Sequence, residues 1–188
     1  MKHLFRSLLL AGLLLAPASA ETYTIDPSHS NVTFRIRHLL SEMEGRFNEI
    51  TGTVDYDPAK PEAAKVSFAV QTKSIDTANA KRDDHLRSAD FFDVTKFPEA
   101  TFVSKSVKKI DDKNLEVSGD FTLHGVTKPL TVQVRIYGPA DTAAGKRLGA
   151  GTEFKIDRRV FGVNSYADPK AVLGDEVTMR INVEGRTK

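Results

Sequence analysis

Residues 77–98 read TANAKRDDHLRSADFFDVTKFP, and they interrupt a pattern that otherwise runs along most of the chain. On both sides of this stretch the apolar residues tend to recur at every second position, which is the period of a half-buried β-strand. Within it, Thr77 or Asn79 can cap a short helix over about residues 78–88, and an aromatic segment follows at 91–98. A sheet interrupted once, by a helix and an aromatic loop, predicts a cup with one covered end.

The first 20 residues have the composition of an export signal. Two basic residues precede an apolar run at 8–16, and a proline leads into the triplet Ala-Ser-Ala at 18–20. These features predict a signal peptide, residues 1–20, that is cleaved after the triplet. The apolar run is shorter than the roughly 20 residues of a membrane-spanning helix. We therefore expect one mature domain, residues 21–188, located in the periplasm.

Charge and cysteine content exclude several classes of protein. The chain has 27 Lys plus Arg and 25 Asp plus Glu, and two of the basic residues lie in the expected signal peptide, so the mature domain is neutral. A neutral domain does not favour nucleic acid as a partner. Cysteine is absent, which excludes disulfides, thiol nucleophiles, cysteine-ligated metals and the lipid-modified cysteine of a lipoprotein. Stability must come from a hydrophobic core.

About eight segments of the chain have one apolar and one polar face. In the first of them Val32, Phe34 and Ile36 alternate with polar residues, as expected for a strand with one side in the core. Phe47 breaks the alternation of the next segment, which predicts a β-bulge near Asn48. Nearly all of the chain therefore reads as β-structure.

Turn residues separate these segments. The sequence HGVTK at 124–128 predicts a hairpin connection in which Gly125 supplies a positive φ, with the return strand starting at Pro129. Residues 138–151 are rich in Gly, Ala and polar side chains, and they predict a surface loop. Links of hairpin length favour an antiparallel arrangement of neighbouring strands.

Eight strands that each have one apolar face most easily close into a barrel, although stacked sheets have the same requirement. The interior of an eight-stranded barrel can be filled by side chains or can hold one small ligand, as in lipocalins. The alternation of apolar residues does not separate a hollow barrel from a filled barrel or a sandwich.

The order of the motifs resembles the YceI family, the exported polyisoprenoid-binding β-barrel proteins. The most specific part is RDDHLRSADFFDVTKFPEATF at 82–102, and the resemblance extends over residues 23–184, including GVTKP at 125–129. It implies an all-β fold, an eight-stranded antiparallel lipocalin-like barrel with a helical insertion near one end. It also implies that the pore holds a long isoprenoid or a similar amphiphilic lipid.

Strand parity then gives the residues expected at such a site. The interior is predicted to be lined by Phe34, Val54, Phe68, Phe102 or its neighbour Val103, Phe121, Leu123, Val134 and Phe154, with Leu86, Phe91 and Phe92 at its mouth. The rim that meets a polar head group is predicted to contain His38, Arg82, His85 and Arg87. Burying one methylene contributes about 0.8 kcal/mol, so an uncharged apolar tunnel is sufficient for useful affinity.

Catalytic and metal motifs are not recognised. Asp83 and Arg87 are spaced to pair along one helix face. The four histidines of the mature domain show no paired spacing, so no metal site and no cofactor are expected besides a bound lipid. The sequence leaves open transient contact with a membrane and a homodimer.

Three functions remain open from the sequence. The first is periplasmic binding, storage or transport of an isoprenoid, a quinone or its precursor, or another fatty amphiphile. The second is an enzyme that modifies such an amphiphile at the barrel mouth, with His38 or His85 as the general base. The third is a filled barrel whose phenylalanine-rich loop binds another protein.

Overall fold

The computed structural model describes residues 20–165 and 172–187, so residues 1–19 of the expected signal peptide lie outside it. The strands are β1 (Glu21–Ile25), β2 (Asn31–His38), β3 (Ser41–Phe47), β4 (Ile50–Tyr56), β5 (Lys65–Gln71), β6 (Ile75–Asp76), β7 (Glu99–Lys109), β8 (Asn114–Leu123), β9 (Val126–Ile136), β10 (Ala140–Thr142), β11 (Gly145–Asp157) and β12 (Leu173–Arg186). The helices are α1 (Ala80–Arg87) and the short 3₁₀-helices η1 (Pro27–His29), η2 (Pro61–Ala63), η3 (Thr72–Ser74) and η4 (Arg158–Phe161).

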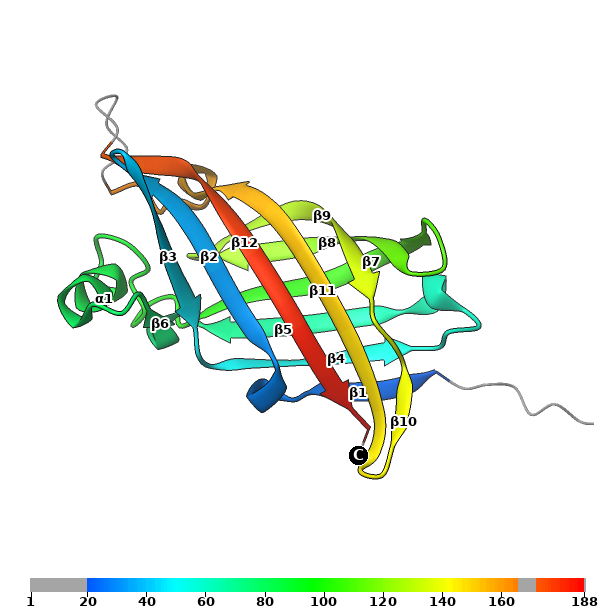
Figure 1. Ribbon diagram of the computed structural model, residues 1–188. Helices are drawn as coiled ribbons and strands as arrows, with labels where there is room; N and C mark the ends of the chain where they lie inside the picture. Colours follow the sequence, from blue (N-terminus) through cyan, green and yellow to red (C-terminus); the bar gives the residue numbers. More distant parts are fainter. Residues whose placement is uncertain (1–19, 166–171, 188) are drawn as a thin grey trace, which may run out of the picture.

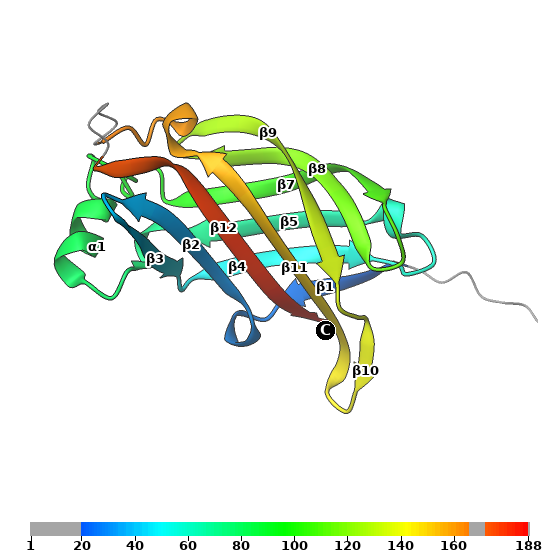
Figure 2. The same ribbon diagram turned by 45° about the horizontal axis from the view of Figure 1, so that its top comes forward.

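Eight strands close into an antiparallel barrel. Their order around the wall is β11-β9-β8-β7-β5-β4-β1-β12, and β12 pairs again with β11 to complete the ring. Figures 1 and 2 show the wall from two directions, with the strands tilted across one another. Closure removes the exposed strand edges that an open sheet would leave in the ring. The predicted eight-stranded antiparallel barrel is confirmed.

A smaller sheet continues from one side of β12. The first part of β12 pairs with β2, while its last residues pair with β1, so one long strand serves both neighbours. Beyond β2 the order continues to β3 and β6. These three strands extend the wall toward the end of the barrel where α1 lies (Figure 1).

The strand β3 was not predicted from the sequence, and the β-bulge near Asn48 was a wrong interpretation of the same region. Phe47 ends β3, and Ile50 begins β4, which pairs with different neighbours. The change of parity therefore marks a change of strand. The alternating pattern of β3 is not visible in the sequence, because one of its inward positions is Gly45. This glycine pairs with Phe34, and an added Cβ would lie only 2.4 Å from the ring atom Cζ.

Of the two turn regions predicted from the sequence, one is a turn in the structure and the other is mostly strand. The hairpin after β8 is confirmed, because His124 and Gly125 have φ of 51° and 74°, as a tight two-residue turn requires. The return strand β9 starts at Val126, three residues before the predicted start. The loop expected at 138–151 is instead β10 and the first half of β11, because backbone pairing with β12 holds this stretch extended despite its small and charged side chains.

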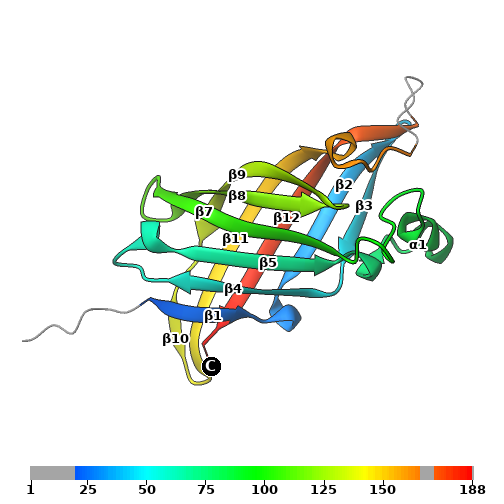
Figure 3. The same cartoon turned by 180° about the vertical axis from the view of Figure 1, so that it is seen from behind.

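The helix α1 lies at one end of the barrel, next to β6 (Figure 3). Asn79 caps it by accepting a hydrogen bond from the Arg82 N–H at 3.0 Å. The aromatic segment that follows packs Phe92 edge-on against Phe47, with ring centres 5.9 Å apart. In the described parts of the chain, no helix has the length and apolar character needed to cross a membrane.

Candidate functional site

The barrel encloses a cavity of about 230 Å³. A single water needs roughly 10–15 Å³, so the barrel is hollow on the scale of a small organic molecule. Around this space the described buried apolar side chains form four clusters, which are joined by partly buried residues such as Phe47, Val54 and Leu86. Many inward-facing side chains, such as Phe68, Phe121 and Phe154, remain only half-buried because no side chain fills the space before them.

The wall of the cavity is almost entirely apolar. Among the described residues that line it, polar groups come from Tyr56, Thr101, Thr152 and Arg158. An empty space with such walls favours hydrocarbon over water, because water needs two or more hydrogen-bonding partners there. The cavity can therefore accept an apolar chain, and little in its wall distinguishes one such chain from another.

All eleven residues that strand parity predicted for the interior and mouth lie at the wall of this cavity. The pairing register explains why they converge, since Phe68, Phe102 and Phe121 are direct partners across β5, β7 and β8. Of the two candidates at one position, Phe102 faces inward, while Val103 is 52% exposed and does not line the cavity.

Other wall residues could not be identified from the sequence. Met43 lies on the unpredicted β3, and Leu173 begins β12. Ala150 and Gly151 line the cavity from the part of β11 that the sequence indicated as a loop. Because their side chains are small or absent, they leave space between the larger residues.

A depression of about 550 Å³, lined by both polar and apolar side chains, adjoins the cavity at the end of the barrel near α1. Its polar side chains are His38, Ser41, Glu42, Arg82 and His85. Four apolar residues line both the depression and the cavity, and so form the partition between them: Met43, Leu86, Phe91 and Leu173. We call the depression the mouth. An apolar chamber behind a mouth that contains polar side chains suits an amphiphile.

Three of the four predicted rim residues, His38, Arg82 and His85, line the mouth. Arg87 is not among its lining residues. Its Nε and Nη2 donate to the carbonyls of Lys73 and Ile75, each at 2.8 Å, and its Nη1 lies 3.0 Å from Asp84. The predicted ion pair of Asp83 and Arg87 is wrong, because Arg87 pairs with Asp84.

Asp83 is buried and faces Thr77. One carboxylate oxygen accepts hydrogen bonds from the Thr77 N–H at 2.9 Å and from its hydroxyl at 2.5 Å. Arg82 then donates to the Thr77 hydroxyl oxygen and carbonyl, both at 2.7 Å. The buried pair of Asp83 and Thr77 thus holds the guanidinium of Arg82 beside the mouth.

Replacing Asp83 by alanine should lower the free energy of unfolding by about 2–3 kcal/mol, because it leaves a buried N–H of Thr77 without an acceptor. Asparagine keeps an acceptor oxygen at the same place, so Asp83→Asn should cost less than half as much. Urea denaturation of the two variants measures the difference. Equal losses would mean that this carboxylate does not fix Thr77.

His85 forms a second polar group at the mouth. Its Nε2 lies 3.0 Å from Asp90, and its ring packs edge-on against Phe91 with ring centres 5.1 Å apart. Both His85 and Asp90 are exposed. A histidine beside a carboxylate can donate a hydrogen bond to a head group, and in an enzyme it can also move a proton.

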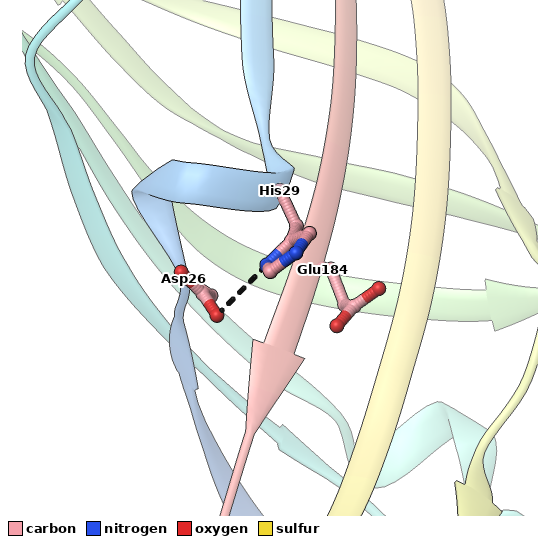
Figure 4. Close-up of side chains that lie close together, drawn as sticks. All are labelled: Asp26, His29 and Glu184. Carbon is pink, nitrogen blue, oxygen red and sulfur yellow. Dashed lines mark hydrogen bonds and ion pairs between the residues drawn. The ribbon is translucent and has the colours of Figure 1, made fainter.

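Three side chains that could ligate a metal lie together away from the mouth: Asp26, which caps η1, His29 in η1 and Glu184 on β12 (Figure 4). The His29 ring lies 3.1 Å from Asp26, and this hydrogen bond is the main cause that lowers the pKa of the carboxyl group. Arg147 already approaches Asp26 at 3.4 Å and Glu184 at 3.6 Å. With the guanidinium of Arg147 between them, these side chains can form an ion-pair network that connects the end of β1 to β11 and β12 without a metal.

Comparisons with known proteins agree with this architecture. Residues 23–185 match the model of the YceI-like domain family. The chain is 42% identical to Protein YceI of Shigella flexneri and to Protein YceI of Escherichia coli O157:H7, over 98% of each chain.

Solved structures share the fold. Burkholderia cenocepacia BcnA has a TM-score of 0.77 at 24% identity, covering 85% of this chain and 98% of its own. The Campylobacter jejuni YceI protein has a TM-score of 0.73 at 32% identity, covering 81% and 90%. A polyisoprenoid binding domain from Saccharophagus degradans has a TM-score of 0.70 at 14% identity, covering 88% and 98%.

Proposed function

Because the chain belongs to the YceI-like domain family, we propose that its barrel binds the hydrocarbon chain of a long isoprenoid or a similar amphiphilic lipid. The observation that carries the proposal is the apolar cavity of about 230 Å³ behind a mouth that contains polar side chains. The solved relative from Saccharophagus degradans, a polyisoprenoid binding domain of the same fold, supports it by analogy. The eight residues predicted for the interior and the three predicted for its mouth all line the cavity, and they would contact the chain.

Burial of methylene groups supplies the affinity. Each one contributes about 0.8 kcal/mol, so ten of them contribute roughly 8 kcal/mol. The loss of translational and rotational freedom costs about 4–15 kcal/mol. Affinity should therefore increase steeply with chain length, and short isoprenoids should bind poorly.

The mouth would hold the polar end of the ligand. Arg82 offers hydrogen-bond donors at a place fixed by Thr77, and His85 lines the mouth beside Asp90. Such groups suit an acceptor-rich head, for example the carbonyl oxygens of a quinone or of its precursor. The wall selects for an apolar chain, and the mouth would select the class of lipid.

The role that fits these features is storage or transport of the lipid in the periplasm. The support is the signal-like pattern of residues 1–20 together with the absence of an N-terminal lipoprotein cysteine. A hydrocarbon chain enclosed by the barrel would be shielded from water between two membranes.

Mass spectrometry of organic extracts tests the proposal. Protein purified from a bacterial host should contain about one intact long-chain amphiphile per barrel, and delipidated protein should rebind a long-chain polyprenol but not a single-unit isoprenoid alcohol. Protein that contains no lipid and rebinds neither compound would contradict the proposal.

A second candidate is an enzyme acting on the same amphiphile, and the contact between His85 and Asp90 favours it. In that case incubation with excess lipid should yield a chemically altered product, which disappears when His38 and His85 are replaced by glutamine. A carrier should return the lipid unchanged in both proteins.

A further inference from the structure

The two-residue turn between β2 and β3 exposes apolar side chains. Leu40 is fully exposed, with 104% of its reference surface in contact with solvent, and Leu39 is 51% exposed. The N–H of Leu39 donates to the carbonyl of Val172 at 2.8 Å, and Val172 is itself 39% exposed. These three residues form one exposed apolar patch, which we call the leucine tip.

Leucine is a poor choice for this turn. His38 pairs with Ser41 across it, so Leu39 and Leu40 are its two central residues, and Leu39 has a φ of 51°. Glycine, asparagine or aspartate normally occupy such positions, because a side chain at positive φ is strained. Exposed leucines gain no packing in return. Where a sequence breaks a local rule of this kind without a compensating gain, function is the expected reason.

The leucine tip lies at the mouth of the cavity. His38 and Ser41, on either side of the turn, line the mouth, and so does Val172. Figure 1 places this turn on the side of the barrel where α1 lies, and places the turn between β7 and β8 at the opposite side. A surface that contacts the tip therefore also lies beside the opening to the apolar chamber.

We propose that Leu39 and Leu40 insert into the surface of a lipid bilayer and so hold the mouth against the membrane. This inference rests on the proposed lipid-binding function, because the membrane contact would serve the transfer of lipid to and from the barrel. A bilayer fits better than a protein partner, because a stable protein interface buries roughly 800 Å² on each partner. Three side chains cannot supply an area of that size. A membrane interface accepts single apolar side chains that penetrate its head-group layer.

Basic groups near the leucine tip fit the same orientation. The guanidinium of Arg37 donates to the Leu39 carbonyl at 3.0 Å, and Arg82 lines the mouth. Both would lie at head-group level when the leucines are inserted. A lipid tail could then pass from the bilayer to the partition of Met43, Leu86, Phe91 and Leu173 without crossing bulk water.

Flotation with phosphatidylcholine vesicles that contain phosphatidylglycerol tests the proposal. The double variant L39G/L40S gives the turn a favoured sequence, so it should melt at the same or a higher temperature than the wild type. Its binding to vesicles should nevertheless fall about tenfold or more, as expected from the loss of two inserted leucines. Ile110 is 47% exposed in the turn between β7 and β8, and the control I110S should bind like the wild type.

The lipid content of each protein, measured in parallel, separates this inference from the proposed function. Vesicle binding that depends on the leucines supports the inference, even in a protein that contains no lipid. Equal binding by the wild type and L39G/L40S would overturn it, whatever lipid they contain. A dimer that forms through the leucine tip, without binding to vesicles, would also overturn it and assign the tip to a second copy of the chain.

Discussion

Replacing Val134 by phenylalanine is expected to displace bound lipid and also to stabilise the lipid-free protein. Val134 lies on β9, is half-buried and lines the cavity. In a hollow barrel the added ring enters free space and buries apolar surface, which should raise the free energy of unfolding by about 1 kcal/mol. The same ring removes space that a hydrocarbon chain needs, so lipid retention should fall at least about tenfold. Thermal unfolding and lipid extraction measure the two effects.

The matched control is Val103→Phe, which makes the same substitution on the outer face of β7. It should change neither lipid content nor stability by a measurable amount. In a barrel filled by side chains the larger residue at position 134 would instead be overpacked, which costs about 1–3 kcal/mol. A destabilised Val134→Phe protein with unchanged lipid content would therefore contradict a hollow interior.

Replacing Arg158 by methionine is expected to lower the free energy of unfolding by about 3–5 kcal/mol. The side chain of Arg158 is 4% exposed. It donates to the carbonyls of Gly174 at 2.8 Å, Val163 at 2.7 Å and Ser165 at 2.8 Å. Burial lowers the pKa of its guanidinium, while Asp175 opposes that shift. Methionine fills a similar volume but leaves these carbonyls without their donor.

The neighbouring Arg159 supplies the control for this prediction. It is exposed and pairs with Asp157 at 2.7 Å and with Asp175 at 3.1 Å, so Arg159→Met should cost less than about 1 kcal/mol. Urea denaturation of both variants gives the comparison. Losses of similar size would mean that the hydrogen bonds of Arg158 contribute no more than an ordinary surface ion pair.

The difference between these two arginines shows what the sequence cannot supply. They are adjacent in the chain and identical in chemistry, yet one is buried and one is exposed. The guanidinium of Arg158 is held by the carbonyls of Val163, Ser165 and Gly174, and no local pattern shows that the chain brings these carbonyls to Arg158 and not to Arg159. The group of Asp26, His29 and Glu184 escaped prediction for the same reason, because it joins the start of the domain to its last strand.

The sequence predicts well what depends on local alternation. The inward position of Phe34, Phe68 and Phe121 follows from the two-residue period of their strands, and the structure places each at the cavity wall. Alternation failed where glycine replaced an inward side chain, as at Gly45, and where small residues made β11 resemble a loop. Whether the barrel is hollow depends on the fit of all its inward side chains together, which no local pattern contains.

A crystal structure of the wild-type protein, purified from bacterial cells with its natural contents, tests most directly whether the barrel encloses free apolar space that holds a hydrocarbon chain. We expect continuous elongated electron density between Phe68, Phe121 and Phe154, reaching the mouth past Leu86 and Phe91. An interior collapsed onto itself, or one filled with ordered water, would contradict the account.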